Sequence, residues 1–384
     1  MKQFRKVFAA LLMILSIVLA CIGVQAFADE SEEEKYEPFF AEEDILDAWG
    51  SFTQEEQADY AGVYVAEDTV VLRFKEGSDS LENATSRNSK NAKMLVDKEK
   101  KLQQSLVIES ATYTYNELKA VYDLLVEKAY SIDGVRSVSL SNKGNCINVG
   151  IAANDRTSEI QKELFTMVKD GTEVKNVEEK PVLSFNIVSD EDEFSYTTSI
   201  NGNSQLKTTY SYGTMYYSAA VRHYSSTYGD GFITTGHGPA VGDAVKYGST
   251  TIGYVKEVHH DGTDDSAFVK FSGSHNWNSI TTRYEEKVSV TPAEGVTIKL
   301  RGYLTKPYAS AEVVSNSFSY FNQQDGMSWT DLIQTDYAVQ AGDSGGAAYW
   351  GTIDGGRTTR VIGVITAANA THTLVVKSSN IENY

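Results

Sequence analysis

Cysteine is nearly absent from this chain of 384 residues, which contains two. Cys21 lies in an apolar N-terminal run and Cys146 lies in the first half, so no disulfide can form within the sequence after residue 146. A region of about 190 residues can still bury enough apolar surface to fold without disulfides. The shortage of cysteine also excludes zinc sites built from cysteine and histidine pairs.

Positive charge is the second shortage. The chain has 34 Lys and Arg against 52 Asp and Glu, a net charge of −18. Residues 29–195 hold 36 acidic against 18 basic side chains, whereas residues 196–384 hold 16 against 13. Neither half offers the basic stripe that phosphate backbones require, so a nucleic-acid partner is not expected.

Residues 1–28 have the pattern of a secretory signal peptide. Basic residues precede the apolar run 7–24, and the small residues of 26–28 supply a cleavage site. Two alternatives stay open, because the run is just long enough for a membrane anchor and Cys21 could carry a lipid. We therefore expect a secreted, extracellular protein that meets a membrane only through an uncleaved or lipidated N-terminus.

The acidic region 29–195 is predicted to form a small α/β domain. Apolar spacing predicts helices over 115–130 and 158–168 and strands over 135–140, 146–151 and 182–188. Asn116 is expected to cap the first of these helices. Before them we expect an arm over 29–60, strand material over 59–74, a loop over 77–93 and a helix over 93–106.

After an acidic linker over 189–193 the composition changes to Tyr, Thr, Ser, Val and Gly. Short β-type runs recur at 216–221, 231–235, 251–258, 267–271, 296–300, 360–365 and 373–376. Many short strands without a helical period are typical of a sandwich or a barrel. Residues 196–384 are therefore predicted to be all-β.

The pentapeptide from Gly342 to Gly346, Gly-Asp-Ser-Gly-Gly, carries the clearest chemistry. A serine hydroxyl becomes a good nucleophile when a neighbouring base takes its proton, and that base needs an orienting acid. His237, in Thr-Thr-Gly-His-Gly, precedes Asp265 by 28 residues, and Asp265 precedes Ser344 by 79. The order and the residue types indicate a Ser, His and Asp triad.

These motifs resemble the chymotrypsin-like serine proteases, most of all the small secreted bacterial streptogrisins and α-lytic protease. The resemblance covers 196–384, and 115–152 is similar to the pro-regions of that group. It implies a chymotrypsin-like double antiparallel β-barrel preceded by a small α/β pro-domain. It also implies His237 as base, Asp265 as its orienting acid and Ser344 as nucleophile, with the N–H groups of Gly342 and Ser344 forming the oxyanion hole.

The same resemblance bears on neighbouring residues. Asp265 fits the family register and Asp264 does not. The resemblance implies that the Asp343 carboxylate is buried and ion-paired, so Asp343 is expected to be structural. Ala338, Thr366, Ala367 and Ala368 would line the substrate pocket. Ala338 stands where trypsin-like members carry Asp, and Ala367 and Ala368 stand where the family often has glycine, so the uncharged and narrower pocket favours small or medium apolar residues before the cleaved bond. The remaining histidines are interpreted as surface or strand residues: His223, His259, His260 and His275. His372 could reach the pocket.

We therefore expect a serine endopeptidase made as a zymogen, which acts on protein or peptide substrates and needs no cofactor or metal. Its region 29–195 would inhibit the enzyme and assist folding, although an independent binding domain remains open. Two rival functions also stay open. One is a non-catalytic binding protein of the same fold, and the other is an esterase or other serine hydrolase using the Gly-x-Ser-x-Gly pattern.

Overall fold

A computed structural model describes residues 41–67, 69–90, 94–97, 102–174, 181–189, 193–196, 206–277, 285–305, 308–322, 326–350, 359–381 and 384. The predicted signal peptide, 1–28, lies outside these residues, as do 197–205, which follow the predicted boundary. Among the described residues, no helix has both the length and the apolar character that crossing a membrane requires.

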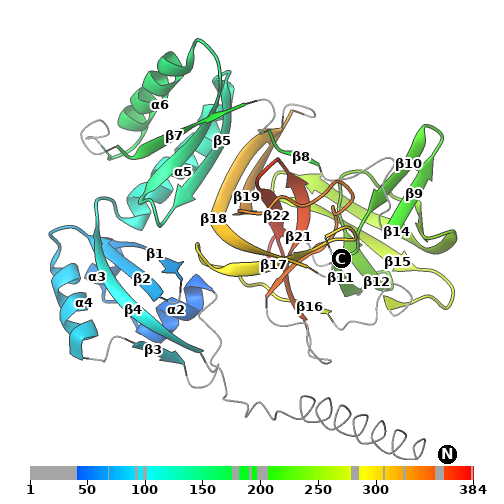
Figure 1. Ribbon diagram of the computed structural model, residues 1–384, viewed down its shortest axis with the longest axis horizontal. Helices are drawn as coiled ribbons and strands as arrows, with labels where there is room; N and C mark the ends of the chain where they lie inside the picture. Colours follow the sequence, from blue (N-terminus) through cyan, green and yellow to red (C-terminus); the bar gives the residue numbers. More distant parts are fainter. Residues whose placement is uncertain are drawn as a thin grey trace, which may run out of the picture.

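The N-terminal lobe (41–111) is a four-stranded sheet with helices packed beside it (Figure 1). Its elements are α2 (Glu42–Trp49), α3 (Gln54–Asp59), β1 (Tyr60–Ala66), β2 (Thr69–Lys75), α4 (Asp79–Lys90), β3 (Met94–Asp97) and β4 (Leu102–Ala111), with strand order β1-β2-β4-β3. The predicted loop over 77–93 and helix over 93–106 were both wrong. Helix α4, which starts after Ser78 accepts the Leu81 N–H, is the crossover that a parallel β2–β4 pair requires.

The middle lobe (112–188) agrees closely with the sequence expectation. It contains α5 (Tyr115–Lys128), the short helix η1 (Ala129–Ser131), β5 (Val135–Ser141), β6 (Cys146–Ala152), α6 (Thr157–Gly171) and β7 (Leu183–Val188). The cap of α5 differs from the prediction, because Thr114 and Glu117 form a capping box and Asn116 lies inside the helix. One apolar cluster joins α5 and α6 to β5 and β6.

The C-terminal part begins with a seven-stranded antiparallel sheet. Its strands are β9 (Leu206–Tyr210), β10 (Gly213–Tyr217), β11 (Val221–Ser225), β12 (Gly229–Thr234), β13 (Ala244–Tyr247), β14 (Thr250–Asp261) and β15 (Asp264–Phe271), in the order β10-β9-β13-β14-β15-β12-β11. This region is all-β over its described residues, as the composition predicts.

A second sheet contains the remaining strands. They are β8 (Ser195–Tyr196), β16 (Glu285–Lys287), β17 (Thr297–Arg301), β18 (Ala309–Asn322), β19 (Met327–Thr335), β20 (Ala347–Trp350), β21 (Thr359–Ala368) and β22 (Thr373–Lys377). Strands β17-β20-β21-β22-β19-β18 pair in sequence, and β18 also pairs with β17, so these pairings form a closed cycle. The two sheets of this part meet beside the C-terminus in Figure 1.

The middle lobe is joined to this second sheet by backbone hydrogen bonds. Strand β5 pairs antiparallel with β18, which makes β5, β6 and β7 a continuation of an eleven-stranded sheet (Figure 1). The N-terminal lobe shares a core with it as well, since Ile45, Leu72 and Phe74 are in one buried cluster with Ile298 and Val313. The described residues of the N-terminal and middle lobes therefore pack with the second sheet as one structure.

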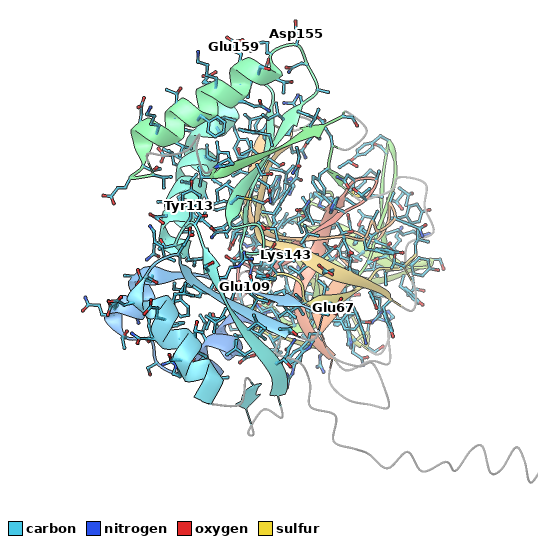
Figure 2. The ribbon with its side chains drawn as sticks, turned by 60° about the vertical axis from the view of Figure 1, so that its left-hand side comes forward. Glu67, Glu109, Tyr113, Lys143, Asp155 and Glu159 are labelled. Carbon is cyan, nitrogen blue, oxygen red and sulfur yellow. The ribbon has the colours of Figure 1, made fainter. Side chains whose placement is uncertain are left out.

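Polar contacts hold the N-terminal and middle lobes together. Arg73 donates to the carbonyl oxygens of Asn142 and Lys143 in the middle lobe, each at 2.8 Å, while Glu109 of its own lobe pairs with its guanidinium at 2.9 Å. Figure 2 shows Glu109 and Lys143 near this junction, whereas Asp155 and Glu159 lie at the far end of the molecule beside α6. Part of the acidic excess thus faces outward on the middle lobe.

Candidate active site

His237 lies just after the end of β12, which is paired with β11 and β15 in the first sheet. The preceding Gly236 allows a close approach of two strands, because a Cβ there would lie 2.0 Å from the carbonyl oxygen of His259. The His237 side chain is buried, with 6% of its surface exposed. Its ring contacts Asp265 from the first sheet and Ser344 from the turn before β20.

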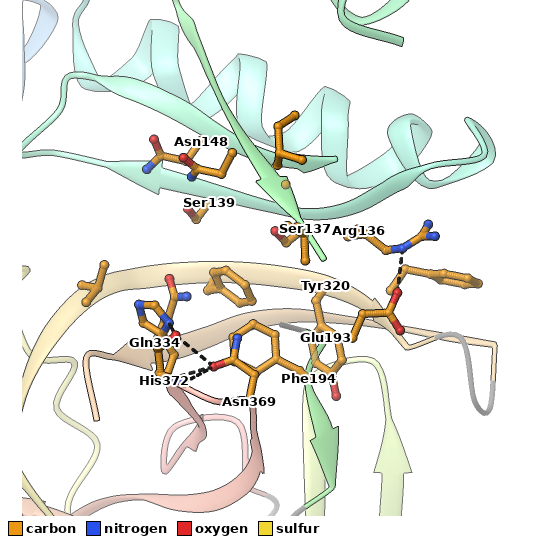
Figure 3. Close-up of a pocket in the computed structure, with 18 residues that line it drawn as sticks. Arg136, Ser137, Ser139, Asn148, Glu193, Phe194, Tyr320, Gln334, Asn369 and His372 are labelled. Atoms are coloured by element: carbon orange, nitrogen blue, oxygen red, sulfur yellow. Dashed lines mark hydrogen bonds and ion pairs between the residues drawn. The ribbon is translucent and has the colours of Figure 1, made fainter. Parts of the chain in front are cut away.

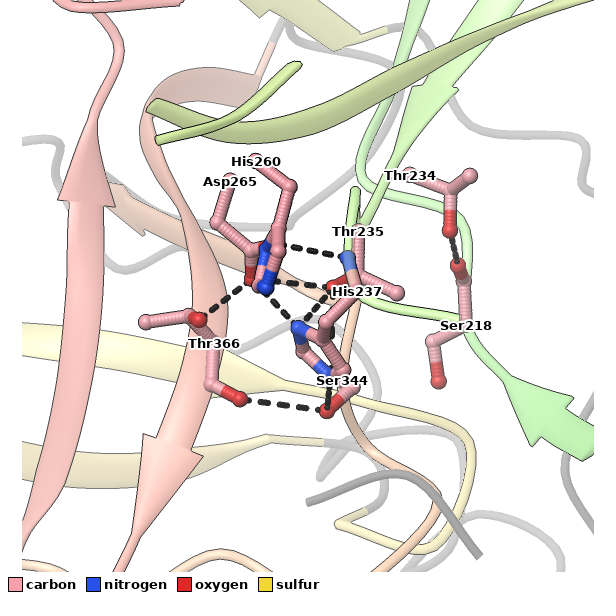
Figure 4. Close-up of polar contacts among 8 residues, drawn as sticks. All are labelled: Ser218, Thr234, Thr235, His237, His260, Asp265, Ser344 and Thr366. Carbon is pink, nitrogen blue, oxygen red and sulfur yellow. Dashed lines mark hydrogen bonds and ion pairs between the residues drawn. The ribbon is translucent and has the colours of Figure 1, made fainter. Parts of the chain in front are cut away.

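Asp265, near the start of β15, accepts hydrogen bonds on both carboxylate oxygens (Figure 4). Its Oδ2 lies 2.5 Å from His237 Nδ1 and also accepts from the hydroxyls of Thr235, at 3.0 Å, and Thr366. Its Oδ1 accepts from the His237 backbone N–H at 2.6 Å and from His260 Nδ1 at 2.9 Å. Asp265, not Asp264, is the carboxylate in contact with His237.

The charge state of this carboxylate follows from its partners. Asp265 is fully buried, which alone would raise its pKa, but the charges and hydrogen bonds of His237 and His260 hold that pKa below its usual range. An ionised carboxylate only accepts hydrogen bonds. In the neutral imidazole of His237 the proton is therefore on Nδ1, which leaves Nε2 as an acceptor.

Ser344 lies in the turn before β20 and faces that acceptor. His237 Nε2 is 2.9 Å from Ser344 Oγ, which is also 3.2 Å from the carbonyl oxygen of Thr366 (Figure 4). The turn requires glycine after the serine, because Gly345 has φ +77° and a Cβ there would lie 2.3 Å from Thr234 Oγ1. The structure thus brings His237, Asp265 and Ser344 into one hydrogen-bonded chain.

Asp343 is buried and stabilises the turn that carries Ser344. Its carboxylate accepts from the N–H groups of Leu304, Thr305 and Gln340, at 2.7, 3.2 and 3.1 Å, and from the Thr305 hydroxyl at 2.6 Å. These contacts are backbone amides and a hydroxyl, whereas the family resemblance implied an ion pair. Sequence motifs could not identify them, because amide partners leave no residue signature.

Gly342 has φ +111°, a conformation that side chains rarely adopt. Its carbonyl oxygen accepts from the hydroxyl of Ser218 at 3.1 Å. Ser218 also accepts from the N–H of Tyr303 at 2.9 Å, and its own N–H donates to the carbonyl of Ser344 at 2.7 Å. Ser218, which sequence analysis did not single out, thus fixes both ends of the nucleophile turn.

The predicted pocket residues divide into separate roles. The Thr366 hydroxyl is turned toward Asp265, so it supports the triad. Ala338 is half-buried beside Val339, whose N–H donates to the Thr373 hydroxyl at 3.1 Å. Ala367 and Ala368 are buried, and they form the strand edge described next.

A strand from the chain itself lies along that edge. Residues Ser195 and Tyr196 of β8 pair antiparallel with Ala368 and Ala367 of β21, directly after Thr366. Phe194, the preceding residue, packs against Phe318 and Tyr320 with ring centroids 5.4 and 5.7 Å apart. The segment that precedes the all-β part is thus held within a short distance of the nucleophile.

A cavity of about 440 Å³ opens beside this segment, between β5–β7 and the strands β18 and β19 (Figure 3). Its walls include Phe194, Arg136 paired with Glu193 at 2.9 Å, and His372. His372 is held by Thr371 and Asn369, and none of the predicted pocket residues lines this cavity. The structure therefore places His372 beside the segment 193–194.

His260, interpreted from the sequence as a surface or strand residue, lies in β14, and its Nδ1 is 2.9 Å from Asp265 Oδ1. It lies directly opposite Asp265 across the β14–β15 hairpin. The position of the tight turn over 261–264 could have indicated this pairing. Over the described residues, His237, His260 and Asp265 are also the group whose ligand atoms are close enough for a metal ion, but here these atoms hydrogen-bond to one another.

The sequence matches no protein-family model and no curated protein. Among solved structures, it is similar to the Nocardiopsis protease, with 22% identity and a TM-score of 0.34 over 45% of this chain and 90% of that chain. A glutamic acid specific serine protease is 19% identical, with a TM-score of 0.33 over 42% and 87% of the two chains. An alpha-lytic protease homolog is 17% identical, with a TM-score of 0.32 over 46% and 92%. These likenesses are weak, and the function is inferred from the residues of this chain.

Proposed function

We propose that this protein is a secreted serine endopeptidase made as a zymogen. The distance of 2.9 Å between His237 Nε2 and Ser344 Oγ carries the proposal, together with the contact from Asp265 to Nδ1 of the same ring. Ser344 Oγ attacks the peptide carbonyl while Nε2 takes its proton, and Nε2 then gives that proton to the departing amine. In the second half of the reaction water attacks the acyl group while Nε2 takes its proton, and Nε2 then returns that proton to Ser344 Oγ as the acid is released.

The developing oxyanion would be bound by the N–H groups of Gly342 and Ser344. Loss of one such donor typically costs about 10²–10³ in rate. The hydrogen bonds of Ser218 and Asp343 support this assignment because they fix the turn that carries both donors. In this proposal the C-terminal part is the double β-barrel of the chymotrypsin-like type, with the triad between its sheets.

Residues 29–195 act as the pro-region in this proposal. Three observations support it: β8 lies along β21 beside the nucleophile, β5 extends the sheet through β18, and the N-terminal lobe shares a buried cluster with strands β17 and β18. A substrate strand would need the edge that β8 covers. Expression of 196–384 alone tests the folding role, since prompt folding to full activity would contradict it.

The substrate preference is proposed to be small or medium apolar residues before the cleaved bond. Ala338, Ala367 and Ala368 support it, because alanines offer neither a counter-charge nor the extra space of glycine. A peptide panel that differs only at that residue tests the preference. Cleavage mainly after Arg, Lys or Glu would refute it.

Labelling by an organofluorophosphate tests the catalytic assignment directly. We expect covalent modification of Ser344 in the processed protein, and loss of hydrolysis by roughly 10⁶ in Ser344→Ala. A non-catalytic binding protein would not be labelled. An esterase that uses a different base would keep its activity in His237→Ala, whereas the proposed protease would lose it.

A further inference from the structure

We propose that His260 is a positioning residue of the active site, which holds the Asp265 carboxylate in the rotation that serves His237. The inference rests on the proposed protease function and deepens it. It begins from a contact of 2.9 Å between His260 Nδ1 and Asp265 Oδ1. Because an ionised carboxylate only accepts, Nδ1 of His260 is the donor.

The hairpin geometry makes this contact a built feature. Asp261 pairs with Asp264 around the turn, and Gly262 there has φ +46°, so His260 and Asp265 face each other on the next pair. Directly opposed side chains on one face have Cβ atoms about 4.5–5.5 Å apart. The Thr330 N–H of β19 donates to the Gly262 carbonyl at 2.8 Å, which ties the turn to the second sheet.

Packing fixes the His260 ring from the other side. The ring lies over Trp329, with centroids 4.9 Å apart, and Trp329 is fully buried in β19. The His260 side chain keeps 26% exposure while Asp265 has none. The imidazole therefore reaches the buried carboxylate from the edge of the site, between elements of both sheets.

The two carboxylate oxygens have different tasks. Oδ2 accepts from the His237 ring and from the hydroxyls of Thr235 and Thr366, whereas Oδ1 accepts from the His237 backbone and from His260. A carboxylate can rotate about its Cβ–Cγ bond, so donors on both oxygens are needed to fix Oδ2 against Nδ1. Charge-assisted hydrogen bonds are the strong class, which suits this role.

A pair of variants of equal shape separates the donor from the ring. His260→Asn keeps a donor on the same side-chain position, and His260→Leu removes it, while both lose the contact with Trp329. In the processed enzyme we expect kcat of the Leu variant to be about tenfold below that of the Asn variant, with similar KM, as for one hydrogen bond to a charge. The low-field proton resonance of the His237–Asp265 pair should shift in the Leu variant and remain close to wild type in the Asn variant.

His259→Leu is the matched control. This neighbour faces the other side of β14, where its ring lies 5.4 Å from Tyr384, so its kcat should stay within about twofold of wild type. Equal kcat in the Leu and Asn variants, or a change confined to KM, would overturn the inference. Processed wild-type protein that resists the organofluorophosphate would overturn the protease proposal itself, which keeps the two failures distinct.

Discussion

The carboxylate of Glu294 accepts a hydrogen bond from the backbone N–H of Asn142 at 2.7 Å, joining the C-terminal part to the middle lobe. The Ser141 hydroxyl and the Lys143 N–H also donate to it, at 2.8 and 3.2 Å. Burial raises the pKa of Glu294 to about 7, against the opposing effect of these donors. A titrating group thus sits at the junction between the proposed pro-region and the proposed enzyme.

The attachment should be stronger in acid. The pKa of Glu294 is higher in the packed state than in the free one, so its contribution is fully present below about pH 4.5 and is lost as pH rises through about 7. In a Ser344→Ala background, we compare the unfolding free energy of the parent with that of Glu294→Gln. The value for the parent minus the value for the variant should be more positive at pH 5 than at pH 8, because only the parent carries the group that ionises. The change is on the order of 3 kcal/mol. Denaturant unfolding at the two pH values measures it, and a constant difference would contradict it.

Thr366→Val should slow catalysis without weakening substrate binding. Its hydroxyl donates to Asp265, while its backbone carbonyl, 3.2 Å from Ser344 Oγ, remains in the variant. Loss of one hydrogen bond to a charge predicts a fall in kcat of about tenfold with little change in KM. Peptide hydrolysis measures both, and Thr366→Ser should restore kcat. Full activity of the Val variant would show that the hydroxyl is dispensable.

Gly345→Ala should disable the nucleophile turn. A methyl group there would lie 2.3 Å from Thr234 Oγ1 and 2.5 Å from the Ser218 carbonyl oxygen, so Ser344 must shift. A displacement of about 1 Å can cost about a hundredfold in rate. The control is Gly242→Ala, where φ is +95° but nothing lies within 4 Å. Equal loss of kcat in both variants would mean that backbone strain alone explains the effect.

The packing of Phe194, which precedes β8, predicts that the processed enzyme prefers peptides with an aromatic residue at the corresponding position. Phe194 packs against Phe318 and Tyr320, so a peptide with the sequence of residues 193–200 should fill the same apolar site in the processed enzyme. Replacing Phe194 by Ala in that peptide should lower kcat/KM by about tenfold, in line with the burial of an aromatic side chain. The difference between the two peptides should largely vanish in the Phe318→Ala enzyme. If it persists there, Phe194 is recognised elsewhere.

The sequence predicts those elements that depend on interactions between residues close together in the chain, and it fails where distant residues decide the structure. Helix α5 and strands β5 and β6 were anticipated because their apolar periods are local. The helix expected over 93–106 is instead the strands β3 and β4, since the parallel register of β4 with β2 outweighs local propensity. Strands β18 and β19 were missed because Ser, Asn and Tyr interrupt their apolar pattern.

The active site shows the same division. His237, Asp265 and Ser344 stand in motifs with a recognisable order, so sequence alone nominated them. Ser218, His260 and Thr366 are defined by contacts between elements, and Ser218 bonds to Gly342, which lies 124 positions away. The contacts of Ser218 and Thr366 depend on the meeting of two sheets, which no local pattern encodes, whereas the His260 contact follows from the register of one hairpin.

The pairing of β5 with β18 has a consequence for the proposed enzyme, if its proposed pro-region is removed. Departure of the N-terminal region would leave the β18 backbone at Phe318, Ser319 and Tyr320 paired with β19 on one side only. An exposed edge strand with unpaired backbone N–H and C=O groups can pair with a strand of another chain. The processed enzyme should accordingly bind other strands at this exposed edge of β18, either the cleaved N-terminal region or a second copy of the enzyme.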